Sequence, residues 1–524
     1  MRKIQILDTT LRDGTQGENI SFSASEKLMI AKKLDQTGFD YIEGGWPGSN
    51  PKDKEFFKKA KKIKLKKAKI TAFGSTRRKN ILAKEDFNLA EIVKSGASAA
   101  AIFGKTWDLH VQKVMNNSLK ENLLMIEDSI RFLKKTGMEV IYDAEHFFDG
   151  FKANPSYALK TLHSAVKGGS KMLVLCDTNG GALNNEINRI IKRTINEFKG
   201  FKNIKFGIHA HNDGALAVAN SLSAVRAGVS MVHGTINGYG ERCGNADLTA
   251  VIPNLELKMD YNCIGKNNLK KLKEISDFVS ELANQVPQNN RPFVGKSAFA
   301  HKGGIHVSAI LKERKAYEHL RPQLVGNKRR VIVSDLSGKS NIEYKAKELG
   351  VKLKDDQESQ IIARRIKKLE NKGYQFDSAE GSLKLLLDSY KNKKVRVFDL
   401  ESFRVTVEKD KEKPCVAHAI VKIAVKGKRE ITAAEGDGPV SALDNAIRKA
   451  LDKFFPKISS MRLVDFKVRV IDGKLGTGAK VRVLIESRDS GKIWTTIGVS
   501  DDIIEASWQA LADSFYYYLK SKKK

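Results

Sequence analysis

The feature that most constrains the fold is a regular alternation of short apolar runs with longer helical runs over the first half of the chain. The apolar runs predict eight β-strands, at residues 4–8, 41–44, 69–74, 99–104, 139–143, 172–177, 204–209 and 231–235. Their ends are about 26–39 residues apart, the size of one strand–helix unit. This pattern predicts a (β/α)8 barrel rather than a doubly wound sheet, since no Gly-rich dinucleotide loop follows the first strand.

Helical patterns fill the segments between these strands, at residues 26–37, 120–135, 157–166, 186–198 and 215–227. In the last of them, Ala215, Val218, Leu222 and Val225 are spaced to share one face. That face should pack on the barrel. Asn220 and Ser223 should then point elsewhere.

The C-terminal 134 residues follow a different pattern, with alternating strands that lead twice into a single helix. An offset of 64 aligns Asp437 with Asp501, Ala442 with Ala506 and Ala446 with Ala510. We therefore expect three domains: a barrel over 1–265, a helical linker that contributes to the active site over 266–390, and a duplicated α+β module over 391–524. Such a module binds a small effector or pairs with a second copy.

The net charge of +32, from 93 basic and 61 acidic residues, is unusual. Nucleic-acid-binding proteins concentrate such an excess in one patch. Here it is spread along the chain, and even the densest run, residues 51–69 with ten lysines, is typical of solvated surface. We expect neither nucleic acid nor a membrane as a partner. Four widely spaced cysteines and no apolar N-terminal segment favour a cytoplasmic protein.

Polar side chains gather after the predicted strands, where barrel enzymes hold their active sites. His209 and His211 are two residues apart on one strand, so both imidazoles face the same space. Asp13 follows the first strand, which neighbours the last in a closed barrel, and Asn245 follows the eighth. Two imidazoles and a carboxylate suit a divalent metal, and this donor set permits Mg, Mn, Zn or Co.

Several motifs carry a resemblance to a known family. LDTTLRDGTQ (7–16), HAHND (209–213) and GYGERCGN (238–245) resemble the isopropylmalate, homocitrate and citramalate synthases, metal-dependent enzymes of Claisen condensation. The runs YIEGGWPGSNP, FGSTRR, YDAEHFFDG and AHKGGIHVSA are similar to the citramalate synthase branch. The duplicated module resembles the regulatory domain of this family, so the resemblance spans nearly the full chain.

The resemblance implies a role for each matching residue. Asp13, His209 and His211 match metal ligands, with Asn245 close to the metal. Arg12 would stabilise developing negative charge, Thr178 would hold the carboxylate of the oxo acid, and Glu145 would lie near the reacting centre. The resemblance also implies a His and a Tyr from beyond the barrel, His306 and Tyr317, with His301 as an alternative to His306.

The implied reaction is condensation of acetyl-CoA with pyruvate, then thioester hydrolysis to citramalate, in isoleucine synthesis. Isoleucine as effector and a homodimer, in which the segment 303–317 completes the barrel of the second copy, are also implied. The alternatives are a 2-isopropylmalate synthase for a branched oxo acid, a lyase on the same barrel, and a basic nucleic-acid-binding protein on a decayed barrel.

Overall fold

The computed structural model describes residues 1–391, 396–412, 414–471, 476 and 478–522. The chain forms two compact units. The barrel unit comprises residues 1–299 and 320–328, and the second unit comprises residues 300–319 and 329–524. These two units do not test the expected division into three domains, with boundaries at residues 265 and 390. That division stays a prediction.

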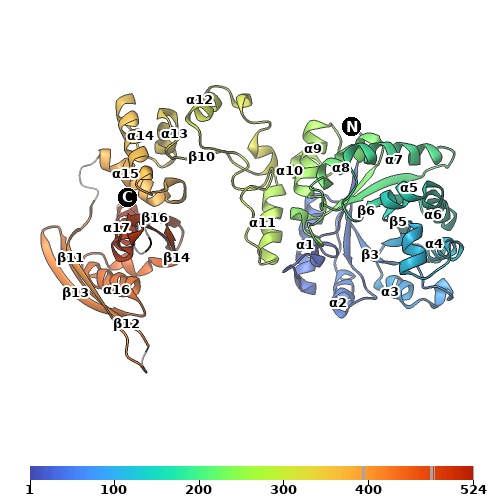
Figure 1. The fold of residues 1–524 in the computed structure, drawn as a ribbon, viewed down its shortest axis with the longest axis horizontal. Coiled ribbons are helices and arrows are strands. Elements are labelled where there is room, and N and C mark those ends of the chain that lie inside the picture. Colours follow the sequence, from blue (N-terminus) through green and yellow to red (C-terminus); the bar gives the residue numbers. More distant parts are fainter. Residues whose placement is uncertain (392–395, 413, 472–475, 477, 523–524) are drawn as a thin grey trace. The chain divides into compact units, whose positions relative to one another are not determined.

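The barrel unit is built on a closed sheet of eight parallel strands, in the order of the sequence (Figure 1). The sheet closes because β1 pairs with both β2 and β8, with Gln5 opposite Met231. This confirms the predicted (β/α)8 barrel. The strands are β1 (Gln5–Asp8), β2 (Tyr41–Gly45), β3 (Lys69–Ser75), β4 (Ala99–Lys105), β5 (Glu139–Glu145), β6 (Met172–Asp177), β7 (Lys205–Ala210) and β8 (Met231–Gly234).

Helices surround this sheet, and local signals fix their ends. In the first helix, Ser23 and Glu26 form a capping box, and Gly38 ends the helix with a left-handed φ of 94°. The helices of this unit are α1 (Ala24–Thr37), α2 (Pro51–Ala60), α3 (Phe87–Ser95), α4 (Leu119–Lys135), α5 (Phe147–Ala153), α6 (Pro155–Gly168), α7 (Asn184–Glu197), α8 (Ala217–Ala227), α9 (Leu248–Lys258), α10 (Lys266–Leu269) and α11 (Leu272–Leu282).

Helix α8 corrects one expectation. Asn220 and Ser223 are buried, whereas Val218 and Leu222 are only partly buried. Both polar side chains donate hydrogen bonds under this helix: Nδ2 of Asn220 to the carbonyl oxygen of Ala182 at 2.8 Å, and Oγ of Ser223 to that of Asn184 at 3.4 Å. The apolar spacing was therefore only partly right: Val225 is buried as expected, but Asn220 and Ser223 are buried with it.

The barrel has an apolar layer on each side of its strands. On β1, Ile6 packs outward against the helices while Leu7 points into the barrel. Alternation along a strand produces this arrangement, and it explains why the strands read as continuous apolar runs. Towards the C-terminal strand ends, the inner layer gives way to buried charged residues such as Asp8, Glu43 and Asp143.

The second unit begins with short helices and a two-stranded parallel ladder. Its elements up to residue 391 are β9 (Ala300–His301), α12 (Gly304–Lys312), β10 (Arg330–Val331), α13 (Lys339–Glu348), α14 (Asp356–Asn371) and α15 (Glu380–Lys391). Residues such as Ile342, Ile362 and Leu383 form a core among α13, α14 and α15. The mostly helical character expected for this part of the chain is present.

The rest of the second unit contains the predicted duplication (Figure 1). Each half is a three-stranded antiparallel sheet followed by one helix. Oγ1 of Thr432 donates to the carbonyl of Ala446, and Oγ1 of Thr496 donates to that of Ala510, both at 2.7 Å and 64 residues apart. The elements are β11 (Asp399–Glu408), β12 (Val416–Val425), β13 (Lys428–Gly436) and α16 (Pro439–Asp452), then β14 (Arg462–Val470), β15 (Val481–Arg488), β16 (Ile493–Ser500) and α17 (Ile503–Ser521). Among the described residues, no helix combines the length and apolar character that crossing a membrane requires.

Candidate active site and metal centre

A cavity of about 200 Å³ opens at the C-terminal ends of the barrel strands. Six of the predicted site residues line it: Arg12, Asp13, Glu145, Thr178, His209 and His211. The other lining residues are Gln16, Trp46, Phe73, Phe103, Asp143, Cys176 and Glu241. The barrel thus brings together side chains from all eight strands or the loops after them.

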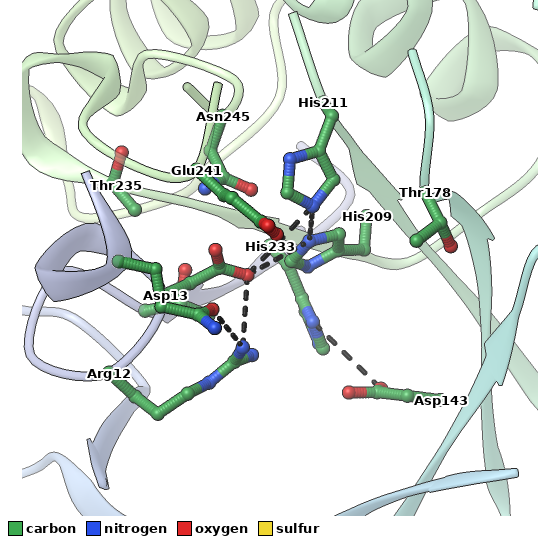
Figure 2. A network of polar contacts seen from close by, with 12 residues as sticks. Arg12, Asp13, Asp143, Thr178, His209, His211, His233, Thr235, Glu241 and Asn245 are labelled. Atoms are coloured by element: carbon green, nitrogen blue, oxygen red, sulfur yellow. Dashed lines mark hydrogen bonds and ion pairs between the residues drawn. The ribbon is translucent and has the colours of Figure 1, made fainter. Parts of the chain in front are cut away.

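Asp13, His209 and His211 form a buried group at this cavity (Figure 2). Oδ2 of Asp13 lies 3.4 Å from Nε2 of His209 and 4.0 Å from Nε2 of His211. The two Nε2 atoms lie 3.2 Å apart. Two ligands about 2.1 Å from one ion and at right angles to each other stand about 3 Å apart, so this spacing fits a shared metal ion.

The unpaired atoms and the electrostatics of this group also suit a metal. Oδ1 of Asp13 and Oδ1 of Asn245 are buried and accept no hydrogen bond from the described residues. Burial lowers the pKa of His211 to about 4, so its ring is neutral at pH 7 and keeps a lone pair for a ligand. Burial opposes ionisation of Asp13, but the charge of Arg12 and a hydrogen bond from His209 hold its pKa well below the usual range.

Arg12 is fixed beside this group by two carboxylates. Its Nε donates to Oε2 of Glu43 at 2.6 Å, and its Nη1 lies 3.1 Å from Oδ2 of Asp13. The guanidinium also stacks over the ring of Phe73, 3.7 Å from the ring centre. Burial alone would lower the pKa of Arg12, but Glu43 and Asp13 raise it, so the side chain is a permanent cation in the cavity wall.

The turn after β1 explains why Arg12 and Asp13 project into the cavity. The buried carboxylate of Asp8 accepts hydrogen bonds from the backbone N–H of Thr10 at 3.0 Å and from its hydroxyl at 2.9 Å. Oγ1 of Thr10 in turn accepts from the N–H of Ile236 at 2.8 Å. The loops after β1 and β8 are therefore tied together directly behind the predicted ligands.

Asn245 is held by a loop that requires glycine. Its Nδ2 donates to the carbonyl of Tyr239 at 3.2 Å, which leaves Oδ1 free, and its backbone pairs with His211. At Gly240, where φ is 151°, a Cβ atom would lie 2.2 Å from this amide nitrogen. At Gly244, where φ is 87°, it would lie 1.9 Å from the carbonyl of Gly238. The run GYGERCGN is thus a tight loop that presents Asn245 beside the imidazoles.

Glu145, on β5, and Thr178, directly after β6, line the same cavity. Glu145 forms an ion pair with Lys105. Oγ1 of Thr178 accepts a hydrogen bond from the backbone N–H of His146 at 2.8 Å, and the Thr178 carbonyl accepts one from Nη2 of Arg242 at 2.8 Å.

His306 and Tyr317 belong to the second unit, whereas the other predicted site residues belong to the barrel unit. Their rings stack with centres 4.3 Å apart, and both side chains are exposed. The alternative, His301, is only partly exposed and lies 3.4 Å from Oε1 of Glu318, which also pairs with Arg329. Exposure favours His306 over His301 as the residue that is available to a substrate.

The sequence interpretation assigned no role to several residues that line the cavity, nor to the buried Glu43, which binds Arg12. Glu43 and Asp143 are carboxylates inside otherwise apolar strands, and that position was the available signal for both. Burial raises the pKa of Asp143 to about 7, with a further rise from Glu43. Trp46 and Phe73 lie in two of the runs that resemble the citramalate synthase branch, and that was their available signal. Phe103 carried none, because an aromatic residue at a strand end is usually core. The three rings pack on one another at centre distances of 5.5 to 5.8 Å.

Comparison with known proteins accounts for nearly the whole chain. Residues 3–279 match the family described as HMGL-like, residues 293–374 match the homocitrate synthase post-HMGL domain-like family, and residues 377–519 match the LeuA allosteric (dimerisation) domain. The (R)-citramalate synthase of Aquifex aeolicus is 52% identical over 519 residues, which cover 99% of this chain and 98% of that protein. The chain belongs to the (R)-citramalate synthase family.

Further relatives agree with this family. The (R)-citramalate synthase of Geobacter sulfurreducens is 52% identical over 522 residues, covering 99% of this chain and 98% of that protein. The 2-isopropylmalate synthase of Methanocaldococcus jannaschii is 34% identical over 530 residues, covering 100% and 96%. As a member of the (R)-citramalate synthase family, the chain is a condensing transferase. The isopropylmalate synthase and nucleic-acid alternatives lack comparable support.

Proposed function

We propose that this chain condenses acetyl-CoA with pyruvate and hydrolyses the resulting thioester, releasing (R)-citramalate and CoA. The observation that carries the proposal is the buried Asp13–His209–His211 group beside Arg12, in a chain that matches (R)-citramalate synthases over its full length. The methyl group of acetyl-CoA loses a proton, its carbon attacks the ketone of pyruvate, and water then splits the thioester.

Asp13, His209 and His211 would hold a divalent metal, with Asn245 beside it, and Mn, Mg, Zn and Co all suit these ligands. When bound, such an ion supplies Lewis-acid polarisation of the ketone.

Arg12 has the charge and position to stabilise negative charge on the reacting oxygens, since Glu43 and Phe73 hold its guanidinium at the cavity wall. Thr178 would donate a hydrogen bond to the carboxylate of the oxo acid. Glu145 would lie near the reacting carbon. The packed rings of Trp46, Phe73 and Phe103 form one wall of the cavity that would hold the oxo acid.

His306 and Tyr317 would act on the proton of acetyl-CoA or on the hydrolysis step. Their exposed, stacked rings support a role in a site that is completed by contact with another surface. We propose a homodimer in which the segment 303–317 of one copy completes the barrel of the other. The match to a dimerisation domain supports this arrangement.

The product would enter isoleucine synthesis, and isoleucine would bind the duplicated module over 391–524 as a feedback effector. The match to an allosteric domain supports an effector there. The four cysteines are unpaired, which supports a reducing cytoplasm.

The experiment is an assay of CoA release by the purified protein with acetyl-CoA and Mn²⁺ or Mg²⁺. Pyruvate, 3-methyl-2-oxobutanoate and 2-oxoglutarate are supplied in parallel. We expect release with pyruvate and little with the others. A preference for the branched acid would instead make the reaction that of a 2-isopropylmalate synthase, and no release with any acid would reject the proposal.

The effector is tested in the same assay by adding isoleucine, with leucine and valine as matched controls. Inhibition by isoleucine alone is expected. Equal inhibition by all three, or by none, would contradict the assignment of isoleucine.

A further inference from the structure

His146 follows Glu145 directly and has a backbone conformation that few side chains adopt. Its φ is 55° and its ψ is 34°, in the left-handed region. This conformation turns the chain from β5 into α5 immediately after a cavity residue. A non-glycine residue held in this region is strained, and such strain persists where the surrounding structure enforces it.

Side-chain contacts hold His146 in this conformation. Its Nδ1 lies 3.0 Å from Oδ2 of Asp149, one turn further along α5. Its ring packs edge-on against His110 with centres 4.4 Å apart, and Trp107 lies behind at 5.9 Å. Burial disfavours ionised Asp149, but the hydrogen bond and charge of His146 lower its pKa, so the carboxylate is a strong acceptor for the ring.

This turn brings the backbone of His146 to the hydroxyl of Thr178, which directly follows the neighbouring strand β6. The backbone N–H of His146 donates to Oγ1 of Thr178 at 2.8 Å. A hydroxyl has one proton, and an oxygen that already accepts a hydrogen bond from one side is directed to donate that proton elsewhere. Arg242 fixes the carbonyl of the same residue, so Thr178 is held at both its side chain and its backbone.

We propose that His146 and Asp149 are positioning residues for the Thr178 hydroxyl, which they orient to donate to the carboxylate of the 2-oxo acid. This inference rests on the proposed function and adds the groups that prepare the site for a carboxylate. Neither side chain need touch the substrate. The contact between the His146 imidazole and the Asp149 carboxylate stabilises the turn. The turn then directs the backbone N–H of His146 toward the Thr178 hydroxyl.

A double-mutant cycle tests the coupling of Asp149 to Thr178. The variants are Asp149→Ala, Thr178→Val and the pair together, with Asp149→Asn as the conservative variant. Glu197→Ala is the matched control, because Glu197 pairs with His163 at 3.3 Å on the outside of the barrel. The readouts are the Kd of pyruvate for the Mn²⁺-loaded protein, measured by calorimetry without acetyl-CoA, and the KM of each substrate.

We expect Asp149→Ala to weaken pyruvate binding about tenfold, as for loss of one hydrogen bond to a charged group. The KM for acetyl-CoA should stay within about twofold, Asp149→Asn should lose less, and Glu197→Ala should match the wild type. In the Thr178→Val background, Asp149→Ala should add almost nothing. Should Asp149→Ala not fold, the cycle is run with Asp149→Asn.

Two results would overturn the inference. One is an equal loss of pyruvate binding from the Asp149 variant with and without the Thr178 hydroxyl. The other is a parallel loss for acetyl-CoA, which a general disturbance of the fold would produce. Failure of the proposed function is distinguishable, because the wild-type protein would then neither bind pyruvate nor release CoA.

Discussion

Asp13 and His209 are 196 positions apart in the sequence, yet Oδ2 of one lies 3.4 Å from Nε2 of the other. Asp13 follows the first strand of the barrel, and His209 lies on the seventh. Closure of the sheet through β1 and β8 produces this proximity. The proposed metal centre is therefore a property of the whole barrel rather than of any local segment.

Replacing a ligand should remove metal and activity together. We expect His209→Ala to reduce CoA release by more than about a hundredfold, beyond the usual loss from a disturbed outer-shell partner. Metal content measured by mass spectrometry should fall in parallel, while the circular dichroism spectrum stays unchanged. His418→Ala, at an exposed histidine on β12, is the control. Full activity in His209→Ala would remove the metal assignment.

Glu43 should prove essential although the resemblance assigned no role to it. Glu43→Ala leaves the buried Arg12 without its closest carboxylate, and loss of one partner from a buried ion pair costs about 3–5 kcal/mol of stability. We expect lower kcat and a lower midpoint of chemical unfolding. Glu43→Gln should lose less, because an amide oxygen still accepts from Nε. Wild-type kinetics in Glu43→Ala would show that Arg12 is held by other contacts.

The glycine loop after β8 gives a prediction about Asn245. A methyl group at Gly240 would displace the Asn245 amide, so Gly240→Ala should weaken Mn²⁺ binding, which titration calorimetry measures. Gly200→Ala is the control, since a Cβ there meets nothing within 4 Å. Equal Mn²⁺ affinity in both variants would indicate that Asn245 does not contribute to the metal centre.

The second unit should become less stable as the pH rises from about 4 to 7. Burial raises the pKa of Asp513 to about 7, against the hydrogen bond that Ser382 donates at 2.6 Å. In the unfolded chain this pKa is about 3.9. Between these values the folded state holds a proton that the unfolded state releases, so stability falls as pH rises and levels off above about 7.

Calorimetric unfolding of the full chain at pH 5 and pH 8 measures this effect. Asp513→Asn should remove most of the pH dependence of the transition of the second unit and raise its Tm at pH 8. Asp437→Asn, at an exposed position before α16, should leave the slope unchanged. An unchanged slope in Asp513→Asn would assign the pH dependence to other groups.

Much of the barrel was predictable because its strands are apolar on both faces and alternate with helical patterns at regular spacing. The metal group was predictable because strand ends in a barrel converge, which places Asp13 near His209 without any knowledge of loop geometry. Asn220 was misplaced because apolar spacing does not show which buried polar side chains find a hydrogen-bond partner, as Asn220 does at the carbonyl of Ala182. Phe103 was missed because nothing in an aromatic residue distinguishes a cavity wall from a core.

The closure of the barrel also constrains when this protein can acquire its metal during synthesis. Translation delivers Asp13 early, but the strand that completes its side of the sheet ends at Gly234. In a nascent chain that has not been translated as far as Gly234, the sheet is still open. Asp13 then lies at no fixed distance from His209 and His211. The chain would therefore bind its metal only after the barrel has closed. Incomplete chains on the ribosome would not compete with finished barrels for the ion.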